Sequence, residues 1–290
     1  MRPQIRLMTP ADVSAGMRLK EIAGWNQTEE DWQRFLDANP DGCFVAECDE
    51  QVAGTVATII YGSVLAWIGM VLVDRQFRGR GIGTALLTKA LDYLDGRQVA
   101  CVKLDATPEG RPIYEHHGFQ VEYAIERCVL KRSDKAGTLV EAPEAIRNTD
   151  SGWITTIDGI LTMDRKIFGA DRGALLKSVA SAAPEFVIAK HRGSHREGYG
   201  LGRKGSRADH LGPWVASSAL AAREILDSFL ARSQRNTVFV DVVKDNAWAP
   251  ALLVERGFQT SRSLTRMYRG PNRCPGEPER VCAILGPEFG

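Results

Sequence analysis

The sequence RGRGIG at 78–83 alternates glycine with arginine and isoleucine, directly after an apolar run and directly before a helical pattern. Glycines let a chain turn tightly and bring its backbone N–H groups close to a ligand. The first N–H groups of a helix have no acceptor inside the helix, and they carry a partial positive charge. These features predict an anion site suited to a pyrophosphate, with Arg78 and Arg80 adding positive charge at its rim. The plainer alternative is a glycine-rich connection with two solvated arginines.

Two other phosphate-binding patterns do not fit the chain. The P-loop pattern GxxxxGK[ST] is absent from the sequence. The dinucleotide pattern GxGxxG occurs as GLGRKG at 200–205, but a polar turn follows it where a helix should open. We therefore interpret 200–205 as a glycine-rich strand and turn.

The elements around the 78–83 loop alternate between strand and helix patterns. Two strands flank a polar turn at Asp49–Glu50, and the continuous apolar run at 66–73 predicts a strand buried on both faces. Apolar residues at helical spacing predict a helix that Thr84 caps and Gly96 ends. A mixed α/β domain is completed by a strand at 99–106, a short helix at 112–116 and a strand pair from 119 to 130.

A second structured region follows a polar stretch at 131–152 that has no sustained period and contains glycine and proline. Its predicted elements are a helix at 170–180, strands at 184–192 and 198–205, a helix at 216–231, and strands at 236–243 and 280–286. The two halves resemble each other: EHHGFQ at 115–120 matches VERGFQ at 254–259, and Thr107 and Asn246 precede these matches at the same interval. This similarity indicates duplication of a whole domain.

Two separate motifs carry a resemblance to a known family. RGRGIG at 78–83 is similar to the [Q/R]-x-x-G-x-[G/A] loop of the GNAT superfamily of acetyl-CoA-dependent N-acetyltransferases. YEHHGF at 114–119 is similar to the superfamily's later Tyr-Glu-x-x-Gly-Phe element. With FGADR at 168–172 and LGP at 211–213, the chain resembles bacterial tandem-GNAT proteins. The resemblance implies a catalytic GNAT domain over 1–132, a linker over 133–150 and a degenerate GNAT-like domain over 151–290.

The resemblance also implies which residues hold acetyl-CoA. The thioester and pantetheine arm would lie along Val71, Leu72 and Val73, at the end of the buried strand. The pyrophosphate would bind the loop made of Arg78, Gly79, Arg80, Gly81, Ile82, Gly83 and Thr84. Thr107 stands where many members have an asparagine that helps to hold CoA, so its contribution is open. Tyr114 would protonate the departing CoA thiolate, although it could also be a helix residue that packs on the sheet.

The general base and the acceptor site are less clear. The strand at 66–73 contains no carboxylate and no histidine, so Asp105 is one candidate base, and a water chain is another. Further candidates come from the first helical region, namely Glu21, Glu29 and Glu30. Trp25, Asn26 and Glu29 lie in the region that shapes the acceptor pocket in the family, and an aromatic wall beside a polar group suits a small amine. Trp25 and Trp32 could equally be core residues.

The second half lacks the features that the first half has. Between its predicted strand and helix stands ADHLGPWVAS at 208–217, which has no basic glycine turn, and Pro213 removes one backbone donor. Leu253 occupies the position that matches Tyr114, so this half offers no acid for a thiolate. We expect a degenerate domain that is structural or contributes to the acceptor site.

Composition limits the other function classes. The chain has 290 residues, 44% of them hydrophobic, and a formal net charge of +1, so no global field attracts it to nucleic acid or a membrane. It has no apolar run long enough to span a membrane and no signal-peptide pattern, which predicts a cytoplasmic protein. The six cysteines lack CxxC spacing, so we expect neither a metal site nor a disulfide framework. Six basic residues in 190–207 form either a site for an acidic partner or a solvated hairpin.

The sequence thus predicts an enzyme that transfers an acetyl group from acetyl-CoA directly to a primary amine, the amine belonging to a small molecule. The alternatives are a non-catalytic acyl-CoA sensor and a protein or peptide N-acetyltransferase. The sequence leaves open the acceptor, the length of the acyl chain and whether the chain forms a homodimer.

Overall fold

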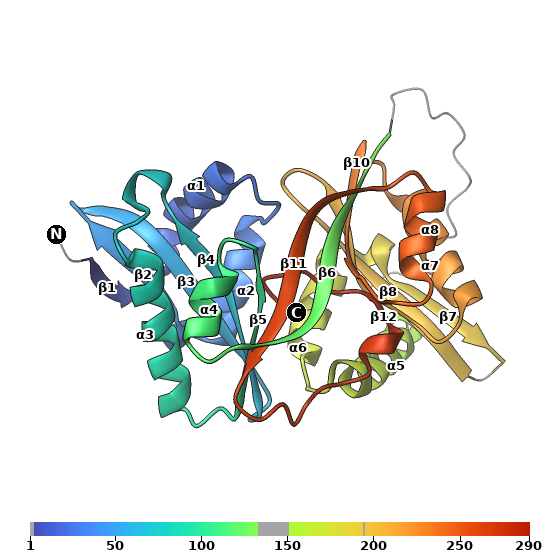
Figure 1. The fold of residues 1–290 in the computed structure, drawn as a ribbon. Helices are drawn as coiled ribbons and strands as arrows, with labels where there is room; N and C mark the ends of the chain where they lie inside the picture. The colour runs from blue at the N-terminus through green and yellow to red at the C-terminus, as the bar shows by residue number, and fades with distance from the viewer. Residues whose placement is uncertain (1–2, 133–150, 194) are drawn as a thin grey trace. The chain divides into compact units, whose positions relative to one another are not determined.

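The computed structural model describes residues 3–132, 151–193 and 195–290 (Figure 1). The predicted linker at 133–150 lies outside the described residues. The chain divides into two compact units, each built from separate stretches of sequence. The first unit comprises Met1–Val121, Met267–Arg273 and Glu288–Gly290, and the second comprises Glu122–Arg266 and Cys274–Pro287. The first unit therefore includes two short segments from late in the chain, in addition to its continuous N-terminal part.

The first unit is a mixed sheet with helices on both faces. Its elements are β1 (Gln4–Leu7), α1 (Val13–Ala23), α2 (Glu29–Ala38), β2 (Cys43–Cys48), β3 (Gln51–Tyr61), β4 (Leu65–Val73), α3 (Ile82–Gly96), β5 (Cys101–Ala106) and α4 (Arg111–His116). Strands β1 to β4 pair antiparallel in sequence order, and β4 pairs parallel with β5. Figure 1 shows α3 and α4 on the near face of this sheet and α1 and α2 behind it.

Side-chain alternation explains these two helical layers. Ala66 and Ile68 of β4 belong to the buried cluster that α3 covers, together with Val102 and Leu104 of β5. Since successive side chains of a strand point to opposite faces, Trp67 and Gly69 face the α1–α2 side. Both faces are therefore buried, which agrees with the continuous apolar run predicted for a strand inside a sheet.

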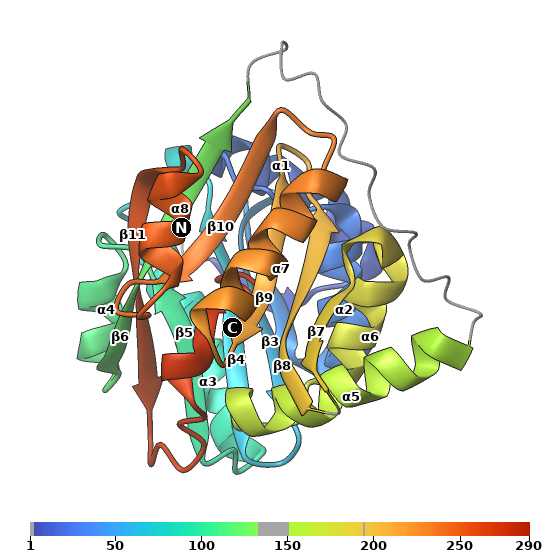
Figure 2. The ribbon, with the colours of Figure 1, turned by 90° about the vertical axis from the view of Figure 1, so that its right-hand side faces the viewer.

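The second unit repeats this arrangement of strands and helices. Its elements are α5 (Ser151–Phe168), α6 (Gly173–Ala182), β7 (Ile188–Arg192), β8 (His195–Lys204), β9 (Asp209–Ala216), α7 (Ala219–Arg232), β10 (Thr237–Val243), α8 (Ala249–Glu255) and β12 (Val281–Ala283), with most of β6 (Gln120–Lys131) and β11 (Gln259–Arg269). The strand order is β11-β6-β10-β12-β9-β8-β7. Helix α7 lies across β8 and β9 (Figure 2).

The matching sequence stretches form the same local structure in each unit. Gly118 follows α4 with φ 82°, and Gly257 follows α8 with φ 81°, a left-handed conformation that glycine adopts without strain. In each turn the next phenylalanine, Phe119 or Phe258, donates its N–H to a carbonyl in the last turn of the helix and buries its ring. The turn repeats, which supports the duplication.

Several local predictions differ from the structure, and the stretch 208–217, predicted as the connection between a strand and a helix, is mostly strand β9. The stretch predicted as a strand pair from 119 to 130 is one strand, β6, because it contains no glycine, proline, asparagine or aspartate to turn the chain. The N-cap of α3 is Gly81 rather than Thr84, so the helix begins inside the glycine loop. Helix α5 was not predicted. The motif GLGRKG lies in and after β8, as expected, and methyl groups at Gly200 and Gly202 would crowd α7 side chains.

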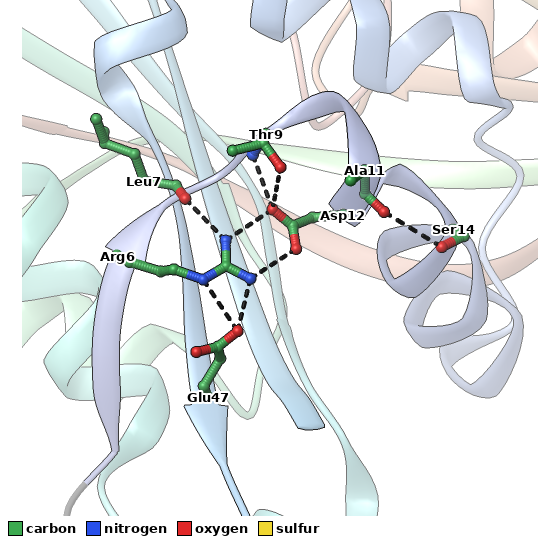
Figure 3. A network of polar contacts seen from close by, with 7 residues as sticks. All are labelled: Arg6, Leu7, Thr9, Ala11, Asp12, Ser14 and Glu47. Carbon is green, nitrogen blue, oxygen red and sulfur yellow. Dashed lines mark hydrogen bonds and ion pairs between the residues drawn. The ribbon is translucent and has the colours of Figure 1, made fainter. Parts of the chain in front are cut away.

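A network of charged side chains ties the first strand to the first helix (Figure 3). Arg6 of β1 makes two hydrogen bonds of 2.8 Å to the Asp12 carboxylate, which also accepts from the Thr9 N–H. The same guanidinium donates to Glu47 of β2. The Arg6 bond is the main reason that the pKa of Asp12 falls to about 2.

Among the described residues, we find no helix with the length and apolar character needed to cross a membrane.

Candidate active site

Strands β4 and β5 separate part-way along their length. They pair only from Leu65 with Cys101 to Trp67 with Lys103, although β4 continues to Val73 and β5 to Ala106. Beyond this point the neighbouring backbones no longer bond to each other. An opening of this kind in a parallel pair exposes backbone N–H and C=O groups that an extended ligand can use.

A β-bulge lies at the start of this opening. The register between β3 and β4 shifts between Thr55 and Ala57, and Met70 has φ 53°, which is uncommon outside glycine. The Thr55 hydroxyl donates to the Met70 carbonyl at 2.7 Å and holds this conformation. The extra residue switches the side-chain alternation, so that Val71 and Val73 join the cluster on the α3 face.

The predicted pyrophosphate loop connects β4 to α3 and is open to solvent. Gly79 and Gly81 have φ of 73° and 78°, and a Cβ at either position would meet no atom within 4 Å. The first intrahelical bond runs from the Ala85 N–H to the Gly81 carbonyl, so the N–H groups at the start of α3 remain available to a ligand. Arg78 donates to the Val73 carbonyl at 3.1 Å, and the Arg80 guanidinium lies over the Phe77 ring.

Asp74 anchors the loop to the sheet. Its carboxylate accepts from Arg18 of α1 and from the Gln76 N–H, and its own N–H donates to the Ala53 carbonyl. The Arg18 bond is the largest of the effects that lower the pKa of this carboxyl group. The loop is thus fixed at its base while its glycines remain exposed.

Tyr114 lies on α4, close to the predicted CoA residue Thr107. A Cβ at Gly110 would lie 3.1 Å from the Tyr114 ring and 3.5 Å from the Thr107 hydroxyl. Burial raises the pKa of Tyr114 to about 12, so the phenol keeps its proton at neutral pH. The Thr107 hydroxyl accepts from the Gly110 N–H, as the Asn246 amide oxygen caps α8 in the second unit.

The cofactor candidates meet around one apolar cluster on the α3 face. Ile82 is part of the cluster, and Val71, Val73 and Tyr114 pack against it. Gly83 lies beside Val73, with 3.6 Å between its ideal Cβ position and a valine methyl group. Gly83 of the loop and the end of β4 therefore lie side by side, and Tyr114 packs against the same cluster.

The acceptor candidates lie elsewhere, around the connection between α1 and α2. Asn26 is buried, Trp25 is partly buried and donates its N–H to the Lys20 carbonyl, and Glu29 is exposed in the first turn of α2. Trp32 is a core residue with no exposed surface and packs against Gly16. Asp105 is partly buried and, by alternation with Leu104 and Ala106, lies on the face opposite Tyr114.

The second unit closes the corresponding opening with its own chain. Strands β9 and β10 pair in parallel from Asp209 to Leu211 and then separate. The short strand β12 fills the space and pairs antiparallel with both of them. Only two residues connect β9 to α7, since β9 ends at Ala216 and α7 begins at Ala219. This connection is too short to form a phosphate loop.

Comparisons with known proteins agree with this geometry. Residues 17–119 match the model of the acetyltransferase (GNAT) family, and residues 160–283 match that of an acetyltransferase (GNAT) domain. The chain belongs to the GNAT superfamily of N-acetyltransferases. The predicted tandem arrangement of two GNAT domains in a mixed α/β fold is confirmed. Members of this superfamily use an acyl-CoA and an acceptor.

Relatives of this GNAT protein span nearly its whole length. A holothin acyltransferase of Pseudoalteromonas sp. (strain SANK 73390) is 27% identical over 267 residues, covering 92% of this chain and 87% of the relative. An uncharacterised N-acetyltransferase of Bacillus subtilis (strain 168) is 25% identical, covering 85% and 84%. A crystal structure of a putative acetyltransferase from Pyrococcus horikoshii has a TM-score of 0.78 at 24% identity, covering 100% of this chain and 96% of that one. The last similarity shows the fold.

Three of the six basic residues at 190–207 form ion pairs within the second unit. Lys190, Arg192 and Lys204 pair with Glu224, Glu197 and Glu185 respectively. The cluster therefore behaves as a hairpin with local ion pairs.

The described residues contain no group of three or more potential metal ligands.

The residues that shape the bulge are not among those predicted from the sequence. Thr55 and Met70 were not singled out, and neither was the segment Glu288–Gly290, which belongs to the first unit. A signal was present in Gly69, because an isolated glycine inside an apolar strand is typical of a bulge or of a close backbone approach. Both occur at this position.

Proposed function

We propose that the first unit transfers an acetyl group from acetyl-CoA directly to the primary amine of a small molecule. The observation that carries this proposal is the opening between β4 and β5, which has the anion-binding loop at 78–84 and Tyr114 on one face and Asp105 on the other. A donor can therefore approach from the α3 face and an acceptor from the α1–α2 face. In this proposal the pantetheine arm lies along Val71–Val73.

The chemistry assigns a role to each side. Asp105 takes the proton of the acceptor ammonium, directly or through water, and the free amine attacks the thioester carbonyl. A C–N bond forms and the C–S bond breaks, and Tyr114 gives its proton to the departing thiolate. The attacking nitrogen then loses its second proton through water, which restores the Tyr114 phenol. Trp25, Asn26 and Glu29 hold the acceptor. Direct transfer is supported by the sequence from Trp67 to Val73, which contains no serine, cysteine or lysine to carry a covalent acetyl group.

Two further features belong to the proposal. A small-molecule acceptor is supported by the relative named holothin acyltransferase, whose name gives a compound and not a protein. The second unit is proposed to bind no cofactor, because β12 fills its opening. The domain division at 133–150 and the cytoplasmic location stay predictions.

Thiol release tests the proposal. Acetyl-CoA is incubated with the full chain and a panel of primary amines, free CoA is followed with Ellman's reagent, and the N-acetylated product is identified by mass spectrometry. We expect amine-dependent release. Binding of acetyl-CoA without release would favour the sensor, and release only with peptides would favour a protein acetyltransferase. Propionyl-CoA and butyryl-CoA in the same assay define the acyl preference.

A further inference from the structure

The segment Glu288–Gly290 is a buried part of the first unit, although it follows the second unit in the chain. Phe289 has no exposed surface, and Glu288 is 2% exposed. The ring of Phe289 stacks on Phe35 of α2, with 4.8 Å between centroids and 17° between planes. Its carbonyl accepts from the Tyr61 hydroxyl of β3 at 2.8 Å. The segment therefore joins α2 to the sheet on the face opposite α3.

The same segment passes over β4 directly beside the bulge. A methyl group at Gly69 would overlap the Glu288 carbonyl oxygen and lie 3.0 Å from its Cα. A methyl group at Gly290 would lie 2.7 Å from the Trp67 ring. Both glycines allow a close approach that no other residue permits. This mutual fit is typical of a permanent contact and not of a segment that moves aside for a substrate.

The bulge needs such support because its backbone is strained. Met70, with its positive φ, directly follows Gly69. A strained conformation persists only where the surroundings fix it. Thr55 fixes the Met70 carbonyl from β3, and the segment Glu288–Gly290 packs on the preceding residue from the α1–α2 side. The bulge in turn sets the direction of Val71 and Val73, on which the thioester is proposed to lie.

We propose that Phe289 is a positioning residue for acetyl transfer, because it anchors the segment that holds the β4 bulge in its reactive conformation. This inference rests on the proposed function of the first unit. It also links the second unit to the reaction, because the segment Glu288–Gly290 of the first unit directly follows the second unit's stretch Cys274–Pro287 in the chain. The loop at 78–84 is anchored separately through Asp74 and Arg18, so binding of the CoA pyrophosphate does not depend on the segment.

Phe289→Ala in the full chain tests this role, and Phe229→Ala is the matched control. Phe229 of the second unit is equally buried and packs on Phe186 with the same centroid distance of 4.8 Å. We measure kcat and KM by thiol release with the best amine of the panel, the Kd for CoA by calorimetry, and the folded fraction by circular dichroism. We expect Phe289→Ala to lower kcat per folded molecule about 100-fold, since small misplacements cost rates of this size. The Kd for CoA should change less than about two-fold, whereas Phe229→Ala should leave kcat nearly unchanged.

Three more variants separate positioning from folding. Gly69→Ala should lower kcat as Phe289→Ala does, because its methyl group displaces the segment, whereas Gly96→Ala adds a methyl group in open space and should be silent. Phe289→Leu keeps most of the apolar volume and should restore most of kcat. Equal kcat per folded molecule in Phe289→Ala, Gly69→Ala and Phe229→Ala would overturn the inference. A wild-type chain that binds CoA but acetylates no amine would instead overturn the proposed function, and this inference with it.

Discussion

At the scale of single residues, the proposed acid and the proposed base lie in two different environments. Tyr114 packs against an apolar cluster on the α3 face, and burial raises its pKa to about 12. Asp105 lies on the other face of β5, on the side of the α1–α2 connection. A phenol that stays protonated is a suitable acid for a thiolate, and a carboxylate on the acceptor side would be a suitable base for an ammonium.

Tyr114→Phe should lower kcat about 100-fold, because a general acid contributes 10²–10⁴-fold. The Kd for acetyl-CoA should stay within about two-fold, since the ring and its packing against Phe119 remain. Because the raised pKa keeps the phenol protonated below about pH 11, the wild-type rate should show no falling limb from Tyr114 between pH 7 and 10. An unchanged rate in the variant, or a falling limb near pH 8 that the variant abolishes, would contradict this assignment.

At the scale of elements, we expect the loop and the start of α3 to form the anion site together. Gly81→Glu should weaken CoA binding at least 100-fold in calorimetry, because it places a carboxylate among the N–H groups that would hold the pyrophosphate. A Cβ at Gly81 would meet no atom within 4 Å, so we expect the charge and not a clash at the backbone to cause the loss. Gly81→Ala measures the cost of the positive φ alone, and Thr88→Glu places the same charge on the exposed side of α3. Equal CoA affinity in Gly81→Glu and Thr88→Glu would exclude the loop as the binding site of the pyrophosphate.

A second element-scale prediction concerns Arg6 and Asp12, which join β1 to the start of α1 (Figure 3). The pKa of Asp12 lies below its ordinary 3.8, at about 2, so the ion pair stabilises the fold above pH 4 and this contribution disappears as the pH falls through 2. Arg6 is 36% exposed, and solvent screening reduces the effect to about 1 kcal/mol.

Asp12→Asn should therefore lower the free energy of unfolding by about 1 kcal/mol at pH 7 and by much less at pH 2. Urea denaturation at the two pH values measures the difference. The exposed Asp92→Asn is the control and should have no effect at either pH. A loss of equal size at both pH values would mean that Asp12 stabilises the fold by packing or neutral hydrogen bonds.

The elements also mark the limit of what the sequence reveals. The buried strand at 66–73, the glycine loop and the Gly-Phe turns were predictable, because local composition and spacing determine them. The bulge at Met70 was not, since it depends on the Thr55 hydroxyl and on a segment more than two hundred positions away in the chain. The single long strand β6 was predictable in principle, since its sequence has no residue that favours a turn.

At the scale of the whole molecule, the first unit is completed by residues that follow most of the second unit in the chain. Met267 has no exposed surface and belongs to the core of the first unit, and Arg269 makes a bidentate ion pair with Asp95 of α3. A fragment that ends at residue 132 lacks these residues and the segment Glu288–Gly290. Tests of cofactor binding therefore require the full chain.

Calorimetry of the full chain with acetyl-CoA should give one site per chain. In the first unit the strands β4 and β5 part and leave an opening beside an eight-residue connection from Asp74 to Gly81, where we expect the anion to bind. In the second unit β12 occupies the opening, and a methyl group at Gly212 would overlap the carbonyl of Ile284, which follows β12. A ligand there would have to displace a paired strand and break its backbone hydrogen bonds. Gly81→Glu should remove all binding heat, and a remaining site in that variant would locate a second cofactor site in the second unit.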